Sequence, residues 1–100
     1  MFIQVIDCRL KDGKFNEFVA LMEQWGREDA HIAPGYIGDD IIRDRNDPNH
    51  VVMIGKFESA EKAAENSNRP EITANYHRMP ALLESEPTFV DGDLILQVEA

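Results

Sequence analysis

The chain of 100 residues lacks the residue patterns that form many well-known metal, nucleotide and catalytic sites. Its one cysteine, Cys8, excludes an intrachain disulfide and any paired-cysteine metal motif. No histidines and acids have metal-ligand spacing, no glycine-rich loop suits a phosphate, and no serine lies in a nucleophile elbow. We therefore expect no metal, no nucleotide and no other cofactor.

Basic residues are also few, with 10 Lys and Arg against 19 Asp and Glu and a formal net charge of −9. Such a chain repels a phosphate backbone, so nucleic acid is excluded as the expected partner. Apolar runs such as residues 51–54 are far shorter than the ~20 residues of a membrane helix. The N-terminus lacks the basic-then-apolar pattern of a signal peptide. We expect no membrane partner and a cytoplasmic location.

What the chain does contain is typical of one folded domain. Hydrophobic residues make up 43% and charged residues 29% of the sequence, without a biased tract or a repeat. One hundred residues support a single core. The prediction is one domain that covers residues 1–100.

The first half of the chain predicts a strand, a helix and a hairpin. Residues 2–10 are rich in strand-forming apolar residues without Gly or Pro. An apolar stripe with helical spacing follows, formed by Phe15, Phe18, Val19, Met22 and Trp25. Pro34 and Gly35 end that helix. Residues 36–44 and 51–57 are predicted strands, joined by the turn formers at 46–49.

The second half predicts a broken helix and a last strand. Ser59 can cap a helix over residues 60–66, and Asn68 with Glu71 resembles a second capping box. The continuation carries an apolar stripe at Ile72, Tyr76, Met79 and Leu83, although Pro80 should kink or shorten it. Residues 89–98 are predicted as the final strand.

The order β-α-β-β-α-β predicts an α+β fold of ferredoxin-like topology, in which a four-stranded antiparallel sheet carries both helices on one face. The strands nevertheless carry apolar residues on both of their faces, as Ile3 and Val5 on one face and Phe2 and Ile6 on the other. A solvated face would alternate cleanly with polar residues. We therefore expect a second copy of the chain to cover the helix-free face in a homodimer.

Several short motifs resemble the antibiotic biosynthesis monooxygenase family. They are Pro34-Gly35-Tyr36-Ile37-Gly38, Arg43-Asp44, Asp47-Pro48, residues 51–57 and Glu58-Ser59-Ala60-Glu61. The resemblance covers nearly the whole chain and implies a dimeric α/β barrel, with a pocket in each subunit between sheet and helices. It also implies either oxidation of aromatic polyketides to quinones without a cofactor or, in another branch, binding and degradation of haem.

The chain departs from the family pattern at three positions. A typical member carries a glutamate where Gly55 stands, a tryptophan at Phe57 and often a histidine near Asn66. The resemblance therefore implies the fold more firmly than the reaction.

The haem-degrading branch uses an asparagine on the first strand, a tryptophan early in the second helix and a histidine later in it. The comparable positions here are Asp7 or a neighbour, Asn66, and Tyr76 or His77. Only His77 could fill its role, which disfavours haem degradation.

Oxidation of a phenol by O₂ without a cofactor requires a base in an apolar pocket. His77 is the first candidate base because its ordinary pKa lies near neutrality, and Tyr76 could donate to a substrate oxygen. Asp7 shares the parity of apolar residues on its strand, where burial would raise its pKa. The alternatives are a surface histidine, a core tyrosine, and an Asp7 that pairs with Arg9 or lies at a dimer edge.

Four further residues are candidates for substrate binding. Trp25 and Phe18, on the inner stripe of the first helix, could wall a flat ligand, and Asn66 could orient it through its amide. Arg43 could contact an acidic or phenolate group. The alternatives are a purely structural core, a helix break at Asn66, and a surface ion pair between Arg43 and Asp44.

The leading hypothesis is a cofactor-independent monooxygenase that acts on a small aromatic, polyketide-like phenol or quinol. The second is a non-catalytic dimeric protein that binds a small ligand or serves as a stress-related accessory. The third is a haem-binding protein with His77 as the axial ligand.

Overall fold

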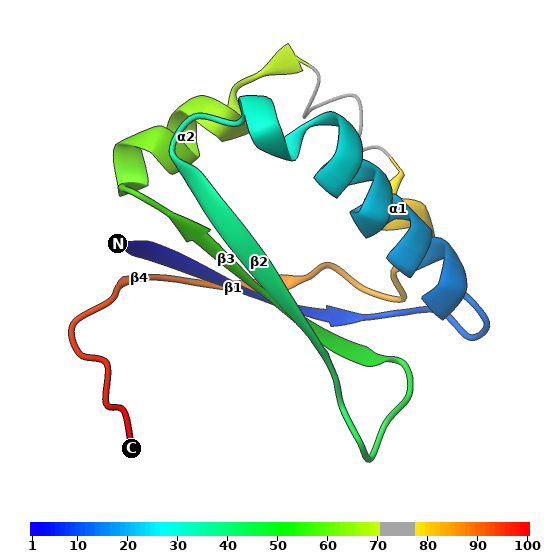
Figure 1. Ribbon diagram of the computed structural model, residues 1–100. Coiled ribbons are helices and arrows are strands. Elements are labelled where there is room, and N and C mark those ends of the chain that lie inside the picture. Colours follow the sequence, from blue (N-terminus) through cyan, green and yellow to red (C-terminus); the bar gives the residue numbers. More distant parts are fainter. Residues whose placement is uncertain (71–77) are drawn as a thin grey trace.

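The computed structural model describes residues 1–70 and 78–100. The elements run in the order β1 (Phe2–Arg9), α1 (Phe15–Glu28), η1 (Ala30–Ile32), β2 (Tyr36–Arg43), β3 (His50–Phe57), α2 (Ala60–Ser67), α4 (Met79–Leu82) and β4 (Thr88–Asp93). The strands form one antiparallel sheet in the order β2-β3-β1-β4. Figure 1 shows the helices on one side of this sheet. The predicted ferredoxin-like α+β fold is confirmed.

Local signals set where α2 and β2 begin. Ser59 caps α2 by accepting a hydrogen bond from the Lys62 backbone N–H at 3.2 Å. Gly35, with φ of 64°, turns the chain into β2 and packs its backbone against Lys62. The predicted continuation of the helix at residues 72 and 76 lies outside the described residues. Among the described residues, no helix is long and apolar enough to cross a membrane.

Alternation along the strands divides the sheet into an inner face, toward the helices, and an outer face. On the inner side lies the core, which consists of Ile6, Cys8, Leu10, Phe18, Val51, Met53, Leu82 and Leu83. Phe18, Leu10, Val51 and Cys8 are fully buried. The outer face carries the residues that alternate with these along each strand. The helices cover the inner face alone, so the two faces differ in what packs on them as well as in their side chains.

A β-bulge in β2 alters the alternation of that strand. Tyr36 pairs with Phe57, and Gly38 pairs with Lys56, so Ile37 is the extra residue between the two pairs. Asp39 then pairs with Gly55. As a result, Tyr36 and Asp39 both face the helices although they are three residues apart.

The last strand is shorter than the sequence predicts. β4 ends at Asp93, not at residue 98, and its last pair with β1 is Asp93 with Phe2. The Leu94 N–H donates to the Met1 carbonyl at 2.9 Å. Beyond that point β4 has passed the end of its neighbour β1, and residues 95–100 are without regular structure. The predicted extension of the strand is therefore wrong within a single chain.

Candidate functional site

A cavity of about 130 Å³ lies between the inner face of the sheet and the helices. Its lining comes from β1, α1, β2, β3, α2 and α4: Gln4, Ile6, Leu21, Met22, Gln24, Trp25, Tyr36, Asp39, Met53, Gly55, Phe57, Ala63, Asn66, Ser67 and Met79. A cavity of roughly this size accommodates a single aromatic ring. Most lining side chains are apolar, and a few polar groups converge among them, as is typical of small-molecule sites.

Three aromatic rings form one wall of the cavity. The centroids of Trp25 and Tyr36 lie 5.5 Å apart with an interplanar angle of 83°, and those of Tyr36 and Phe57 lie 5.4 Å apart at 64°. These edge-to-face contacts fix the ring positions beyond what burial alone achieves. Trp25 is the only tryptophan of the chain, so its fluorescence reports directly on this wall.

A carboxylate reaches into the aromatic wall. The Tyr36 hydroxyl donates to Asp39 Oδ2 at 2.5 Å, and Trp25 Nε1 donates to the Tyr36 hydroxyl at 3.4 Å. Trp25 on α1, Tyr36 at the start of β2 and Asp39 in its middle therefore form one chain of hydrogen bonds, the relay. Among the described residues, the other oxygen of Asp39, Oδ1, accepts no side-chain hydrogen bond.

The surroundings shift the protonation of both acidic groups in this relay. Desolvation by the surrounding aromatic wall raises the pKa of Asp39 above its ordinary value, although the residue belongs to an edge strand and is exposed on one side to solvent. Burial, reinforced by the hydrogen bond to Asp39, raises the pKa of Tyr36 far above its usual range. Tyr36 therefore remains a donor at neutral pH, and Asp39 is a stronger base than a solvated aspartate.

Gly55 leaves room for the Asp39 carboxylate. A Cβ atom at Gly55 would lie 3.0 Å from Asp39 Oδ1, which is closer than nearly all real Cβ contacts. The glycine on β3 and the aspartate on β2 are register partners. The resemblance implies a glutamate at position 55 on β3. This chain has a glycine there, and the carboxylate of Asp39 on the neighbouring strand lies beside it.

The structure places two of the predicted binding residues in the cavity lining, Trp25 and Asn66. Asn66 is buried at the end of α2, where its Oδ1 accepts a hydrogen bond from Arg69 Nη1 at 3.0 Å. Its amide is therefore held in one orientation. It lies beside the helix end as the alternative interpretation expected, and it lines the cavity as well.

Phe18 and Arg43 lie elsewhere. Phe18 is fully buried in the core and lines a separate groove of about 320 Å³ between α1 and β2. In the same groove the Arg43 guanidinium lies 3.7 Å from the centroid of the Phe15 ring, and its Nε donates to the Pro48 carbonyl at 2.9 Å. Neither residue lines the cavity, and the expected ion pair of Arg43 with Asp44 is replaced by these contacts.

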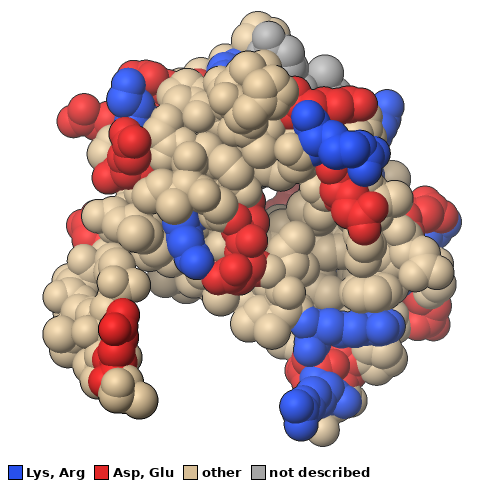
Figure 2. Space-filling model, viewed as in Figure 1, with Lys and Arg blue, Asp and Glu red and all other residues tan. Residues whose placement is uncertain are grey.

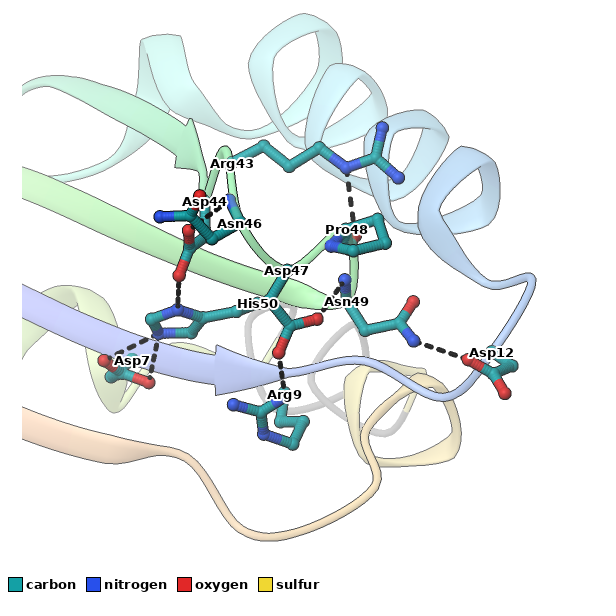
Figure 3. A network of polar contacts seen from close by, with 10 residues as sticks. All are labelled: Asp7, Arg9, Asp12, Arg43, Asp44, Asn46, Asp47, Pro48, Asn49 and His50. Atoms are coloured by element: carbon teal, nitrogen blue, oxygen red, sulfur yellow. Dashed lines mark hydrogen bonds and ion pairs between the residues drawn. The ribbon is translucent and has the colours of Figure 1, made fainter.

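Asp7 lies on the outer face, away from the cavity. His50 stands between two carboxylates, with Nδ1 at 2.8 Å from Asp44 and Nε2 at 3.0 Å from both oxygens of Asp7 (Figure 3). Arg9 pairs with Asp47 beside them. The Asp7 side chain is 51% exposed in the single chain and does not line the cavity. The other two predicted catalytic residues, Tyr76 and His77, lie outside the described residues.

Sequence reasoning missed five polar residues of the lining: Gln4, Gln24, Tyr36, Asp39 and Ser67. One signal was available, because two consecutive acids at 39 and 40 are unusual inside a strand. The bulge at Ile37, which aligns Tyr36 with Asp39, has no signature in the local pattern. Among residues 1–70 and 78–100, no group of three or more His, Cys, Asp or Glu could hold a metal ion.

The sequence profile of the family described as antibiotic biosynthesis monooxygenase matches residues 1–78. The chain belongs to this family. The family resemblance seen in the sequence is thereby confirmed. A search of curated protein sequences finds no match.

Solved structures, two of them described as antibiotic biosynthesis monooxygenases, are similar along almost the whole chain. A protein from Nitrosomonas europaea has a TM-score of 0.81 at 16% identity, covering 96% of this chain and 100% of its own. One from Deinococcus radiodurans has a TM-score of 0.82 at 10% identity, covering 100% and 98%. A mutant of SnoaB, a cofactor-independent oxygenase from Streptomyces nogalater, has a TM-score of 0.78 at 17% identity, covering 95% of each chain. Identities this low establish a shared fold.

Proposed function

We propose that this protein is a cofactor-independent monooxygenase that acts on a small aromatic phenol or quinol. The observation that carries the proposal is the Asp39 carboxylate, whose pKa is raised, in the wall of an aromatic cavity about the size of one ring. Family membership and the similarity to an oxygenase fold support the same reaction type.

The first step is removal of a proton from the substrate. In this proposal the substrate ring packs against Trp25 and Phe57, and Asp39 Oδ1 accepts its hydroxyl proton. Tyr36 stays protonated and keeps Asp39 Oδ2 hydrogen-bonded throughout. A base with a pKa closer to neutrality is better matched to a phenol than an ordinary aspartate.

The second step is attack of the electron-rich anion on O₂. A C–O bond forms at the ring carbon, and loss of water from the resulting peroxide breaks the O–O bond. One oxygen atom becomes the carbonyl of a quinone, and the other leaves as water. All the electrons come from the substrate, so no external reductant is needed. The apolar lining shelters the anion from bulk water.

Oxygen uptake with a panel of single-ring phenols and quinols, naphthoquinols and anthrone-like compounds tests the proposal. We expect turnover with ¹⁸O₂ to place one labelled oxygen in the product, measured by mass spectrometry. The double variant His77→Ala and Tyr76→Phe tests the roles predicted for those two residues. Absence of turnover above the rate without protein, for every compound in the panel, would rule out the proposed activity.

A non-catalytic ligand-binding protein is the second candidate, and the predominantly apolar lining favours it. Quenching of Trp25 fluorescence by the same aromatic compounds separates the two functions. Quenching with micromolar affinity together with no oxygen uptake would favour the binding protein. Quenching together with uptake would favour the enzyme.

Haem binding is the third candidate. Among the described lining residues there is no histidine, so its expected axial ligand is His77. A haem titration in which the Soret band does not shift, or shifts equally in His77→Ala, would dispose of this candidate.

A further inference from the structure

One row of polar residues crosses the inner face of the sheet. Asp39 on β2 pairs with Gly55 on β3, which in turn pairs with Gln4 on β1. Gln4 pairs with Asp91 on β4. Side chains of directly paired residues lie on the same side of an antiparallel sheet. The row therefore places three polar side chains, from β2, β1 and β4, along one line of the face that carries the apolar core.

Gly55 leaves the middle of this row without a side chain. Asp39, Gly55 and Gln4 all line the cavity, so a ligand above Gly55 lies between the Asp39 carboxylate and the Gln4 amide. Because β3 separates β2 from β1, the backbones of the two flanking strands are about 9.6 Å apart. A spacing of this order suits one ring that carries a polar group at each end.

Asp91 fixes which way the Gln4 amide is turned. Gln4 Nε2 donates to Asp91 Oδ1 at 3.1 Å. A carboxylate can only accept, so the NH₂ end of the amide must face Asp91. Among residues 1–70 and 78–100, no donor reaches Gln4 Oε1, and the same holds for Asp39 Oδ1 on the other side of Gly55. Each side of the gap thus offers an oxygen that can accept a hydrogen bond from a ligand.

The charge around the cavity disfavours an anionic ligand. Figure 2 shows a hollow between the helices and the sheet, with acidic side chains beside it. Asp39 and Asp91 stand at the two ends of the polar row, and the chain has a formal net charge of −9. A carboxylate or phosphate on the ligand would meet like charge at either end, whereas a neutral hydroxyl can donate to each free acceptor.

We propose that Gln4 is a second anchor for the substrate and that it selects a neutral ring with hydroxyls at opposite ends, a para-diol. The inference rests on the proposed function, because one hydroxyl gives its proton to Asp39 Oδ1 while the other donates to Gln4 Oε1. Asp91 is a positioning residue that acts through Gln4, since its hydrogen bond turns the amide oxygen away from β4 and leaves it available.

A second hydroxyl is compatible with the proposed reaction. After Asp39 removes a proton, the anion attacks O₂ at a free ring carbon beside its oxygen, and a C–O bond forms there. Loss of water then breaks the O–O bond. The hydrogens of this water are the proton held by Asp39 and the hydrogen of the attacked carbon. One oxygen atom stays on the ring, so the diol becomes a hydroxyquinone and supplies all the electrons that O₂ takes up.

Binding of small phenols with oxygen excluded tests this anchor separately from turnover. Trp25, the only tryptophan, gives one indole N–H signal in ¹H–¹⁵N NMR spectra and lies in the cavity wall. Hydroquinone and catechol have the same size, and only hydroquinone has its hydroxyls at opposite ends. We expect hydroquinone to bind about 3- to 10-fold more tightly than catechol or 4-methoxyphenol, the effect of one neutral hydrogen bond. The anion 4-hydroxybenzoate should bind most weakly.

Gln4→Met keeps the length of the side chain and removes the acceptor. In this variant hydroquinone should lose its advantage over 4-methoxyphenol. Phenol has one hydroxyl and should bind the variant and the wild type alike, which reports that the cavity is intact. An advantage of hydroquinone that survives in Gln4→Met would overturn the inference. So would equal affinities for hydroquinone and 4-methoxyphenol in the wild type.

Two changes at Asp91 test its positioning role. Asp91→Ala should lose part of the preference for hydroquinone, because the Gln4 amide is then free to turn. Asp91→Asn should retain the preference, since an asparagine oxygen still accepts from Gln4 Nε2. Asp93→Ala, two residues further along β4 and outside the described cavity lining, is the matched control. Equal preferences in Asp91→Ala and Asp93→Ala would remove Asp91 from the proposal.

Oxygen uptake decides the proposed function independently of these titrations. Turnover without a preference for hydroquinone would keep Asp39 as the base and would overturn Gln4 as the anchor. A preference that depends on Gln4, found without turnover of any compound, would support the anchor in a ligand-binding protein and rule out the enzyme.

Discussion

Asp39 and Asp40 are neighbours in β2 that experience opposite surroundings. Asp39 points to the inner face, where it accepts a hydrogen bond from Tyr36 and desolvation raises its pKa. Asp40 points to the outer face, where its side chain is 68% exposed and pairs with Lys56. The pleat of one strand thus gives two identical side chains different chemistry.

The same contrast extends over the two faces of the sheet. On the inner face, apolar packing surrounds a few polar groups, and the base in the cavity is costly to ionise. On the outer face, carboxylates are matched by cations, and hydrogen bonds from His50 and Arg9 lower the pKa of Asp44 and of Asp47. The inner face is therefore suited to proton transfer, whereas the polar contacts of the outer face contribute to stability.

The largest expected effect comes from removing the centre of the inner face. Phe18→Ala should lower the free energy of unfolding by about 3–5 kcal/mol, because the side chain is fully buried. Urea unfolding measures this. On the outer face Val90→Ala, at a side chain 66% exposed, is the control and should cost less than about 1 kcal/mol. Equal costs at the two sites would break the contrast between the faces.

Asp39→Asn should reduce kcat/KM at least about 100-fold, as expected for loss of a general base. For the wild type we expect kcat/KM to fall as pH drops through the raised pKa of Asp39, and the variant should lack this limb. Asp40→Asn is the matched control and should change the rate little. A fully active Asp39→Asn protein would remove Asp39 from the mechanism.

The same variant should not lose stability at neutral pH. The folded pKa of Asp39 lies above its unfolded value, so stability falls as pH rises between the two values, and the ionised group costs stability above them. Asparagine removes this cost and can still accept from Tyr36. Thermal unfolding at pH 7 should therefore give a melting temperature equal to or above that of the wild type.

Gly55→Ala should have a smaller effect than Asp39→Asn. The new methyl group would meet Asp39 Oδ1 at 3.0 Å and displace the carboxylate by a few tenths of an ångström. We expect a drop in kcat/KM of about 10-fold, since misplacement of a catalytic group by a full ångström can cost about 100-fold. Steady-state kinetics measure this. Gly38→Ala, where an added Cβ meets nothing within 4 Å, is the control.

The smallest expected effect is the pH dependence of stability due to His50. Hydrogen bonds to Asp44 and Asp7 raise its pKa above the ordinary value of 6.5. Its contribution is therefore fully present below pH 6.5 and is lost as pH rises through the raised value. Melting temperatures between pH 5.5 and 8.5 should decline in the wild type more than in His50→Gln. Parallel curves would show that the outer pairing of His50 adds no stability.

Much of the fold could be predicted because its signals are local. The helical stripe from Phe15 to Trp25, the Ser59 cap and the turn formers at 46–49 each act over a few residues, and each element formed where the pattern indicated. Two cavity residues, Trp25 and Asn66, followed from their positions on predicted helices. Phe18 and Arg43 were placed on the correct elements, although they line a different groove.

The rest of the site depended on features that no local pattern encodes. A regular strand would put Tyr36 and Asp39 on opposite faces, and the bulge at Ile37 puts them on the same face. Asp7 has the parity that the sequence predicts, but the pairing of β1 with β3 sets it against His50 instead of burying it. The end of β4 was missed for the same reason, because it depends on where β1 begins.

By itself, the sequence determined the element order, the family and the apolar character of both sheet faces, since residue spacing and composition act along the chain. Only the tertiary structure decided which carboxylate enters the cavity, because strand register and one bulge bring Asp39 over Gly55 and against Tyr36. It also separated the short β4 from the apolar residues that follow it. The chain has few recognisable site residues, and packing alters the chemistry of an ordinary one: desolvation raises the pKa of Asp39.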